Sequence, residues 1–289
     1  MSWVNAVVQG VLLGGLYALF ATGLSLAFGV MRFVNLAHGD LATFAAFMAF
    51  SLTRTHAVSI LVALAIVLPA SFVVGYLLQR VVFDRVIGAD PAYQIVATFG
   101  LAIIVENALL EKYTADTRGL DFGKLATSSI RINDKMSIGW LPLLTFLCGV
   151  GVLVALALFL KRTRLGRAFR ATSDDPRAAQ LMGIDNRRIY SVALAISLLT
   201  VALAGVLDGA RRSFDPFAGP IQLIYAFEAV IIGGLGSLWG TLAGGIALGV
   251  AQNVGAQISP QWGPMIGHVV FMTVLASRPT GMFGKAEAR

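Results

Sequence analysis

Residues 141–160 read LPLLTFLCGVGVLVALALFL and contain no charged side chain. An α-helix needs about 20 consecutive apolar residues to cross the hydrocarbon core of a bilayer, and this run has that length. Three further runs without charge are of the same kind: Val11 to Val30, Ile60 to Gln79 and Ile189 to Leu207. The sequence therefore predicts an all-α polytopic membrane protein with one transmembrane domain over residues 1–289.

The composition of the chain supports a membrane protein. Of its 289 residues, 57% are hydrophobic and 13% are charged, whereas soluble domains have about 45–50% apolar and about 25% charged residues. The single cysteine, Cys148, lies within the run 141–160, so neither a disulfide nor a cysteine metal site is expected. The first apolar run lacks the features of a removable signal peptide, and we expect this helix to be retained.

The segment after the run 141–160, Lys161 to Arg188, is the most basic part of the chain. It contains eight basic and three acidic residues, which gives it a net charge of +5. Lysine and arginine are enriched in the cytoplasmic loops of membrane proteins. We therefore predict that residues 161–188 form a cytoplasmic loop. We attribute the net charge of +7 of the chain to membrane topology rather than to nucleic-acid binding.

Alternation across the bilayer then assigns the preceding segments, because a spanning helix normally crosses completely to satisfy its backbone hydrogen bonds. The polar segment Glu111 to Gly139 becomes an external loop. Before it, the apolar segments Ala92 to Leu110 and Leu36 to Leu52 are further predicted helices. Counting back through them places the N-terminus outside.

Three apolar segments follow the run 189–207 and a short loop from Arg211 to Pro220. They are Ile221 to Gly234, Trp239 to Gln257 and Met265 to Ser277. The first and third are shorter than a full span, which is typical of a half-helix or a re-entrant segment. The sequence thus predicts eight or nine hydrophobic helices, some of them broken or re-entrant, and the basic tail predicts an inner C-terminus.

Glycines recur at intervals of four residues towards the C-terminus, at Gly236, Gly240 and Gly244 and again at Gly245 and Gly249. On a helix this spacing forms a flat face that lets a second backbone approach closely. A phosphate-binding loop would require a Gly-Lys-Ser/Thr sequence, which does not follow here. We therefore interpret Gly236, Gly240, Gly244 and Gly249 as helix-packing residues.

The stretch VNLAHGD, residues 34–40, carries three polar side chains in an apolar setting. Asn35 can cap a helix, and Asp40 in the first turn suits the helix dipole. Alternatively, Asn35, His38 and Asp40 mark a broken helix at membrane depth, where their polar groups line a translocation pathway. The two interpretations are compatible, and both stay open.

Glu106 and Glu228 are isolated carboxylates in apolar segments, and Asn107 follows the first of them. An ionisable residue inside a membrane is costly and suggests a function, although a position near the bilayer surface would reduce the cost. We include Glu106, Asn107 and Glu228 among the candidate pathway residues. The three histidines of the chain lack metal-ligand spacing, so neither a metal site nor a catalytic centre is predicted.

Within the predicted cytoplasmic loop, residues 171–184 read ATSDDPRAAQLMGI. Asp175 followed by Pro176 is typical of a helix start, and Gly183 is typical of a helix stop. The pattern predicts a helix of about two turns, from Pro176 to Met182, which is too short to be stable alone in water. It is either an ordinary helix resting on the membrane surface or a docking element for a soluble partner.

The residues RAAQLMG, from Arg177 to Gly183, resemble the coupling helix of ATP-binding-cassette (ABC) importer permeases. In that helix Glu-Ala-Ala, three residues and Gly insert into the ATPase subunit, and Arg177 stands at the position of the glutamate. The resemblance covers nearly the full length and includes residues 15–47, 162–185, 229–252 and the tail RPTGMFGK. On these stretches the chain resembles the LivH-like permease subunits of high-affinity branched-chain amino acid ABC transporters.

This resemblance implies a multi-pass subunit of a bacterial inner-membrane importer that works by alternating access. The implied partners are a second, LivM-like permease subunit, two cytoplasmic ATPases that bind ATP and Mg²⁺, and an external substrate-binding protein. The chain itself is expected to bind no cofactor. The implied coupling residues are Asp175, Pro176, Arg177, Ala178, Ala179 and Gly183. Related permeases carry urea, short amides or small carboxylates, so these substrates stay open beside branched-chain amino acids.

Two other classes of protein compete with an ABC permease. A self-sufficient ion-driven carrier would use Asp40, Glu106 and Glu228 as proton or cation sites. A membrane-embedded enzyme would need a cluster of catalytic residues, which the sequence lacks. Uptake by the isolated chain under an ion gradient would favour the carrier.

Overall fold

Long helices make up most of the structure, a computed structural model that describes residues 3–88, 90–133 and 136–283. Within these residues, five helices are long and apolar enough to cross a membrane. They are α1 (Trp3–Met31), α3 (Ile60–Val81, continued by the 3-10 turn η1, Phe83–Arg85), α4 (Pro91–Tyr113), α6 (Trp140–Arg162) and α9 (Asn186–Arg211). The prediction of an all-α polytopic membrane protein is confirmed.

Four further apolar helices are shorter, less apolar or sharply bent. They are α2 (His38–Thr55), α10 (Gly219–Gly233), α11 (Leu238–Ile258) and α12 (Trp262–Ser277). Helices α10 and α11 meet at a bend of 117° and together count as at most one more span. Among the described helices, five or six therefore have the length and composition of a full span. The count of eight or nine hydrophobic helices, which includes broken or re-entrant ones, stays a prediction.

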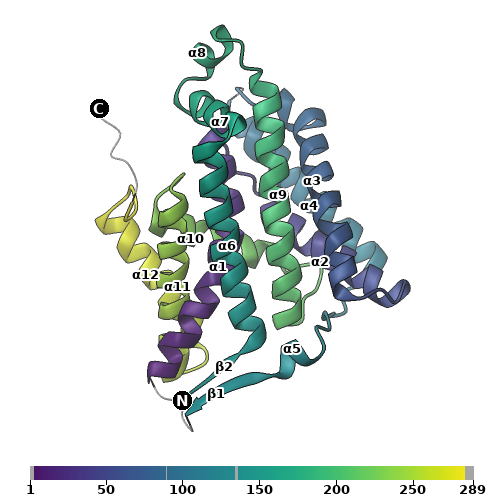
Figure 1. The fold of residues 1–289 in the computed structure, drawn as a ribbon, viewed down its shortest axis with the longest axis vertical. Coiled ribbons are helices and arrows are strands. Elements are labelled where there is room, and N and C mark those ends of the chain that lie inside the picture. The colour runs from purple at the N-terminus through teal and green to yellow at the C-terminus, as the bar shows by residue number, and fades with distance from the viewer. Residues whose placement is uncertain (1–2, 89, 134–135, 284–289) are drawn as a thin grey trace.

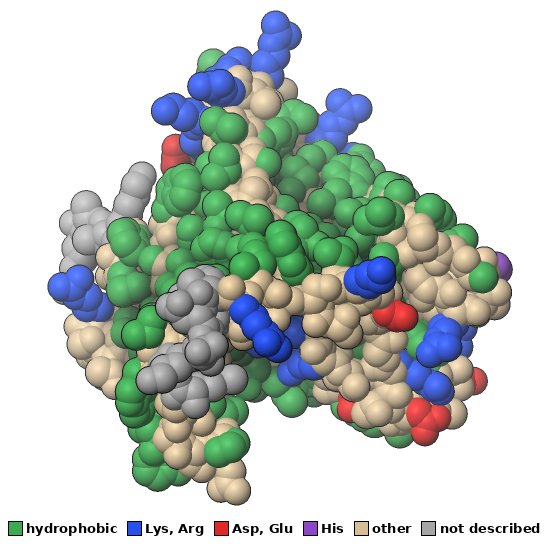
Figure 2. All heavy atoms as spheres, turned by 60° about the horizontal axis from the view of Figure 1, so that its bottom comes forward, with side chains coloured by type: hydrophobic (Ala, Val, Ile, Leu, Met, Phe, Trp, Pro, Cys, Tyr) green, Lys and Arg blue, Asp and Glu red, His purple; other side chains and the backbone are tan. Residues whose placement is uncertain are grey.

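The two predicted loops lie at opposite ends of the bundle. One includes α7 (Arg164–Asp174) and α8 (Pro176–Leu181), at the top of Figure 1. The other includes α5 (Lys124–Thr127) and the antiparallel strands β1 (Ser129–Asn133) and β2 (Met136–Gly139), at the bottom of Figure 1. In Figure 2 a broad hydrophobic surface covers the middle of the molecule, and Lys and Arg gather at the top. This arrangement fits one loop on each side of a membrane.

Helix α2 begins inside the bundle and not at its end. The chain leaves α1 after Met31 and runs without helical structure until His38, whose Nε2 donates to the carbonyl oxygen of Phe20 in α1 (3.0 Å). Phe20 lies eleven residues before the end of α1, which corresponds to about 16 Å along the helix axis. α2 therefore starts roughly halfway along α1, and the non-helical segment before it covers the remaining depth.

The cap at the start of α2 differs from the sequence prediction. The N-cap position belongs to Ala37, which makes no side-chain cap hydrogen bond. The Asn35 side chain lies two residues further back, where its Oδ1 accepts a hydrogen bond from the Ala37 N–H (3.0 Å). The assignment of Asn35 as the helix cap is therefore wrong, because its side chain closes a local turn before the helix begins.

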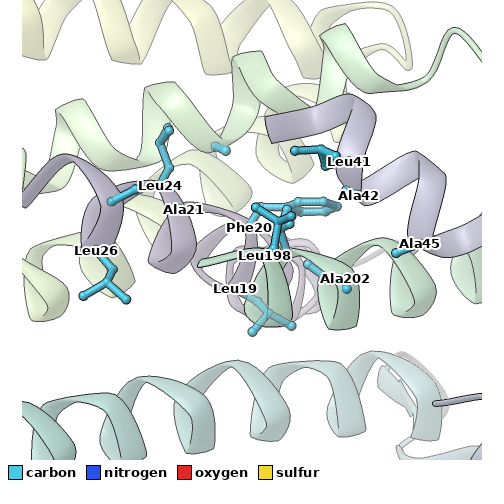
Figure 3. Close-up of a cluster of buried hydrophobic side chains, with 14 of the residues drawn as sticks. Leu19, Phe20, Ala21, Leu24, Leu26, Leu41, Ala42, Ala45, Leu198 and Ala202 are labelled. Carbon is cyan, nitrogen blue, oxygen red and sulfur yellow. The ribbon is translucent and has the colours of Figure 1, made fainter. Parts of the chain in front are cut away.

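Helices α1 and α9 form the centre of the bundle. In an apolar stretch of 18 residues within each helix, 83% of the residues of α1 and 72% of those of α9 are buried. The corresponding share is 22% or less in α3, α4 and α6. Figure 3 shows side chains from three helices in this core: Leu19 and Phe20 of α1, Leu41 of α2, and Leu198 and Ala202 of α9. The exposed sides of α3, α4 and α6 are available for lipid or for other subunits.

Helix α11 packs closely on α1 and α10 through glycines. A Cβ atom on Gly245 would lie 2.7 Å from the carbonyl oxygen of Gly14, and a Cβ atom on Gly249 would lie 2.5 Å from the Gly14 nitrogen. Gly240 and Gly244 leave equally little space where they face α10. Close backbone approach of this kind is how small residues hold helices together in a membrane.

Gly236 has a different role from the one that its spacing suggests. It lies in the turn between α10 and α11 with a φ of +78°, in the left-handed region that favours glycine. A Cβ atom there would approach only the Gly29 backbone, at 3.5 Å. The interpretation of Gly236 as a helix-packing residue is wrong, because the turn geometry and not a helix face requires the glycine.

Candidate functional site

A cavity of about 270 Å³ lies between α1, α9 and α10. Its lining is Leu13, Leu16, Tyr17, Phe20, Asp208, Arg211, Arg212, Gln222 and Tyr225. Asp208 and Arg211 belong to the last turn of α9 and Arg212 follows it, at the same end of the bundle as the predicted external loop. The volume is below the roughly 300–1,000 Å³ of drug-sized pockets and suits a solute of amino-acid size.

One wall of the cavity is built around the buried carboxylate of Asp208. The Nε of Arg212 donates to both carboxylate oxygens (3.0 and 2.8 Å), and its Nη2 lies 2.7 Å from Oδ2. The side-chain amide of Gln222 donates to the same Oδ2 (3.1 Å). Asp208 and Arg212 therefore neutralise each other, and Gln222 fixes α10 against α9.

Arg211 lies beside this pair but does not take part in it. Its guanidinium is an electrostatic neighbour of Asp208 and Tyr17, but among the described residues it forms neither a hydrogen bond nor an ion pair with them. Because Asp208 is matched by Arg212, the guanidinium of Arg211 leaves the cavity with one uncompensated positive charge.

The rest of the lining is mostly aromatic and apolar. Tyr17 and Tyr225 lie with their ring centroids 5.0 Å apart, and Leu13, Leu16 and Phe20 complete this part of the lining. The Tyr17 hydroxyl donates to Gln252 Oε1 of α11 (2.5 Å), which fixes the position of its ring. A cavity with one polar and one apolar wall can bind a small solute that has both kinds of surface.

The predicted pathway residues near the start of α2 are buried and do not line this cavity. The side chains of Asn35, His38 and Asp40 are at most 3% exposed, and none of them lines it. Asp40 packs against Gly219 at the first turn of α10, and its Oδ1 has no hydrogen-bond partner among the described residues. The starts of α2 and α10 thus meet at a buried carboxylate, which both helix dipoles favour.

Glu106 and Asn107 lie on α4, about two turns before its end at Tyr113. The side-chain amide of Asn107 donates to the Ile103 carbonyl oxygen in its own helix (2.8 Å). Glu106 is half-buried and is an electrostatic neighbour of Asp40. Neither residue lines the cavity, so their role in a pathway stays a prediction.

Glu228 forms a pair that the sequence did not suggest. Its Oε1 lies 2.5 Å from Nδ1 of His268 in α12. The ring of His268 stacks on that of Tyr225, which lines the cavity, with the two ring centroids 6.2 Å apart. The Glu228 side chain is 5% exposed, whereas that of His268 is 46% exposed. The pair therefore connects the cavity wall to the outer surface of α12.

The local structure of α8 follows the sequence pattern. Asp175 Oδ1 accepts hydrogen bonds from the N–H groups of Arg177 (2.8 Å) and Ala178 (3.0 Å), Pro176 occupies the first turn, and Gly183 has a φ of +83°. The helix ends at Leu181, one residue before the predicted end. Ala179 faces inward with 4% exposure. The remaining surface of α8 points away from the bundle.

Side-chain hydrogen bonds join the loop of α7 and α8 to the two central helices. The side-chain amide of Asn186, the first residue of α9, donates to the Pro176 carbonyl oxygen (2.7 Å), and its Oδ1 accepts from Thr172 (3.2 Å). The Ser173 hydroxyl donates to the carbonyl oxygen of Gly29, near the end of α1. The loop of α7 and α8 is thus attached to α1 and α9, two of the three helices that line the cavity.

The cavity residues were absent from the sequence prediction although a signal for them exists. Arg211 and Arg212 lie at the end of the bundle that is predicted to be external, whereas lysine and arginine normally concentrate in cytoplasmic loops. With Asp208 they place three charged side chains within five residues at the end of an apolar span. Basic residues at the external end of a span, where lysine and arginine are normally scarce, therefore indicate a candidate site.

Comparisons with known proteins agree with one family. Residues 6–275 match the family model described as the permease component of branched-chain amino acid transport systems. The chain is 28% identical to the high-affinity branched-chain amino acid transport system permease protein BraD of Pseudomonas aeruginosa, over 99% of this chain and 97% of that protein. It is 27% identical to the corresponding permease protein LivH of Escherichia coli K12, over 99% and 96%.

A chain in the solved structure of PsaBC from Streptococcus pneumoniae in complex with Fab also resembles this chain, with 14% identity and a TM-score of 0.49. The similarity covers 98% of this chain and 94% of that chain.

Proposed function

Because this chain belongs to the family of permease components of branched-chain amino acid transport systems, we propose that it carries an amino acid across the membrane by alternating access. Separate cytoplasmic ATPases, which bind ATP and Mg²⁺, drive the movement. The observation that carries this proposal is α8, a capped helix that projects from the bundle and is hydrogen-bonded to the helices of the cavity.

The exposed side of α8 suits contact with an ATPase. Leu181 is 89% exposed and Met182 is 84% exposed, and two large apolar side chains at the tip of a loop are costly to leave in water. Arg177 is exposed on the same short helix, so a charged group accompanies the apolar tip. An ATPase groove that covers both residues would bury them and hold α8.

Movement of α8 has a direct route to the cavity. Asn186 transmits a displacement of α8 to α9, whose far end carries Asp208 and Arg211. Ser173 transmits it to α1, which carries Tyr17. Because α1 and α9 both contribute lining residues, a relative shift of these helices would open or close the cavity towards one side of the membrane.

The remaining partners follow from the two ends of the molecule. The loop over residues 111–139 is available to an external substrate-binding protein, and the Arg118–Phe214 backbone bridge ties this loop to the segment after α9 (N–O distances of 2.7 and 2.8 Å). In this proposal the chain resides in the bacterial inner membrane. The substrate-binding protein would therefore bind beside the mouth of the cavity.

The surface of α12 around His268 suits a second, LivM-like permease subunit. A half-exposed pair of hydrogen-bonded ionisable side chains between apolar helices is costly against lipid, and the His268–Glu228 pair is such a case. A protein surface that covers α12 removes this cost. The cavity wall at Tyr225 then lies close to the boundary between the two permease subunits.

A photo-crosslinking amino acid at Met272 is expected to capture the second permease subunit. Met272 lies one turn after His268 and is 61% exposed, so it shares the face of α12 that carries His268. The same amino acid at Ile104 of α4, which is 66% exposed, is the matched control and should not capture that subunit. Mass spectrometry identifies the products, and capture from Ile104 but not from Met272 would move the interface to α4.

Reconstitution tests the proposed function. Proteoliposomes that contain this chain, the second permease subunit and the ATPases, together with the substrate-binding protein, are expected to accumulate radiolabelled leucine only when ATP is supplied. The isolated chain under an ion gradient should accumulate none. Uptake by the isolated chain would instead support an ion-driven carrier, for which the unpartnered Asp40 and its neighbour Glu106 are the candidate ion sites.

A further inference from the structure

We propose that Arg211 is a carboxylate-binding residue of the permease and that the cavity beside it receives small solutes through their carboxylate group. This inference rests on the proposed function, because it assigns a ligand to the cavity of the importer. It also separates the possible substrates: amino acids and small carboxylates carry the required group, whereas urea and short amides do not.

The charge of the cavity points to an anionic group. Arg212 is fully engaged with Asp208 through three contacts of 3.0 Å or less. Arg211 lines the cavity and is an electrostatic neighbour of Asp208, but it has no such hydrogen bond among the described residues. Its guanidinium carries five N–H donors that a solute in the cavity can use. A planar guanidinium matches the two oxygens of a carboxylate, which can accept two parallel hydrogen bonds.

The surroundings of Arg211 strengthen such a contact. Tyr17 and Tyr225 close one side of the cavity, and Leu13, Leu16 and Phe20 provide an apolar surface. Partial removal of water makes an ion pair stronger than it would be at an open surface. The same surface accommodates an aliphatic side chain, and the faces of the two tyrosine rings suit a neighbouring ammonium group.

A purely structural role for Arg211 would be a favourable contact with the helix dipole at the end of α9. That role requires only a positive charge, whereas carboxylate binding requires the two-pronged guanidinium. The substitutions Arg211→Lys and Arg211→Gln therefore distinguish the two. Arg54, exposed in the last turn of α2, provides the matched control substitution Arg54→Gln.

The first test is transport by the assembled importer. Arg211→Gln is expected to reduce ATP-dependent leucine uptake at least about tenfold, in line with the loss of one charge-assisted contact, while stimulation of ATP hydrolysis by the substrate-binding protein stays within about twofold. Arg211→Lys should give an intermediate loss, and Arg54→Gln none. Unchanged uptake by Arg211→Gln, or full activity of Arg211→Lys, would overturn the carboxylate assignment.

The second test measures binding of the solute at Arg211 directly, without transport. Phenylglyoxal modifies accessible arginines, and mass spectrometry measures the modification of Arg211 and Arg54 in the assembled importer in nanodiscs. Leucine and 4-methylpentanoate, which share a carboxylate, should slow modification of Arg211 but not of Arg54, whereas leucinamide should slow neither. Equal protection by leucinamide, or no protection by leucine, would overturn the assignment. Absence of ATP-driven uptake by the unsubstituted importer would refute the proposed function instead.

Discussion

An importer that carries Leu181→Asp together with Met182→Asp is expected to lose ATP-driven uptake at least about a hundredfold, because apolar residues central to an interface contribute about 2 kcal/mol or more each. Both side chains are more than four-fifths exposed in the permease, so the permease itself should fold normally. The loss is measured as leucine uptake by proteoliposomes and as the amount of ATPase that co-purifies with the tagged permease.

The control for this double substitution lies at the opposite end of the bundle. Leu125 of α5 is 46% exposed, and Leu125→Asp introduces the same charge on the side away from the ATPases. ATPase co-purification should be retained in this variant. If the ATPases stay bound to the Leu181→Asp, Met182→Asp permease at the normal level, α8 is not their docking element.

The structure of α8 could be predicted because residues close in sequence determine it. Asp175 bonds to the N–H groups two and three residues further along, and Gly183 adopts the left-handed conformation that few other residues tolerate. The sequence missed the attachment of α8 to the bundle. That attachment depends on Asn186 and Ser173, and the Gly29 carbonyl that Ser173 contacts is far away in the sequence.

The cavity could not be assembled from sequence because its walls come from three distant helices. Tyr17, Asp208 and Gln222 meet only after α1, α9 and α10 have packed. Apolar residues surround α1 on all sides, so no amphipathic pattern indicates which face meets α9. The same limit applies to the pairing of Glu228 with His268, since each appears in its own helix as an isolated polar residue.

The length of an apolar segment identifies the full spans, but it does not show where the shorter apolar helices begin. The rule that a span needs about 20 apolar residues correctly identified the five long helices. It could not reveal that α2 starts halfway along α1, because the Asn35 turn and the contact of His38 with Phe20 depend on the packed bundle. Counting apolar segments therefore gave more hydrophobic helices than there are full spans.

Gly249→Leu is expected to prevent stable assembly of the bundle. A Cβ atom at this position would lie 2.5 Å from the backbone nitrogen of Gly14 and 2.9 Å from its Cα. Backbone atoms cannot move aside as a flexible side chain can, so α11 would have to separate from α1, the most buried of the spanning helices. Overpacking of an adaptable core costs about 1–3 kcal/mol, and we expect a larger loss here.

Gly151→Leu provides the matched control for this substitution. Gly151 also lies within a spanning helix, α6, but an added Cβ atom would meet nothing within 4 Å. Detergent-solubilised Gly151→Leu should elute as a single species and melt close to the unsubstituted chain, whereas Gly249→Leu should give little folded protein or melt at a clearly lower temperature. Equal melting of the two variants would show that close approach of α1 and α11 does not hold the bundle together. The glycine spacing would then need another explanation, because lipid provides no hydrophobic drive to join these helices and packing of small residues must supply it.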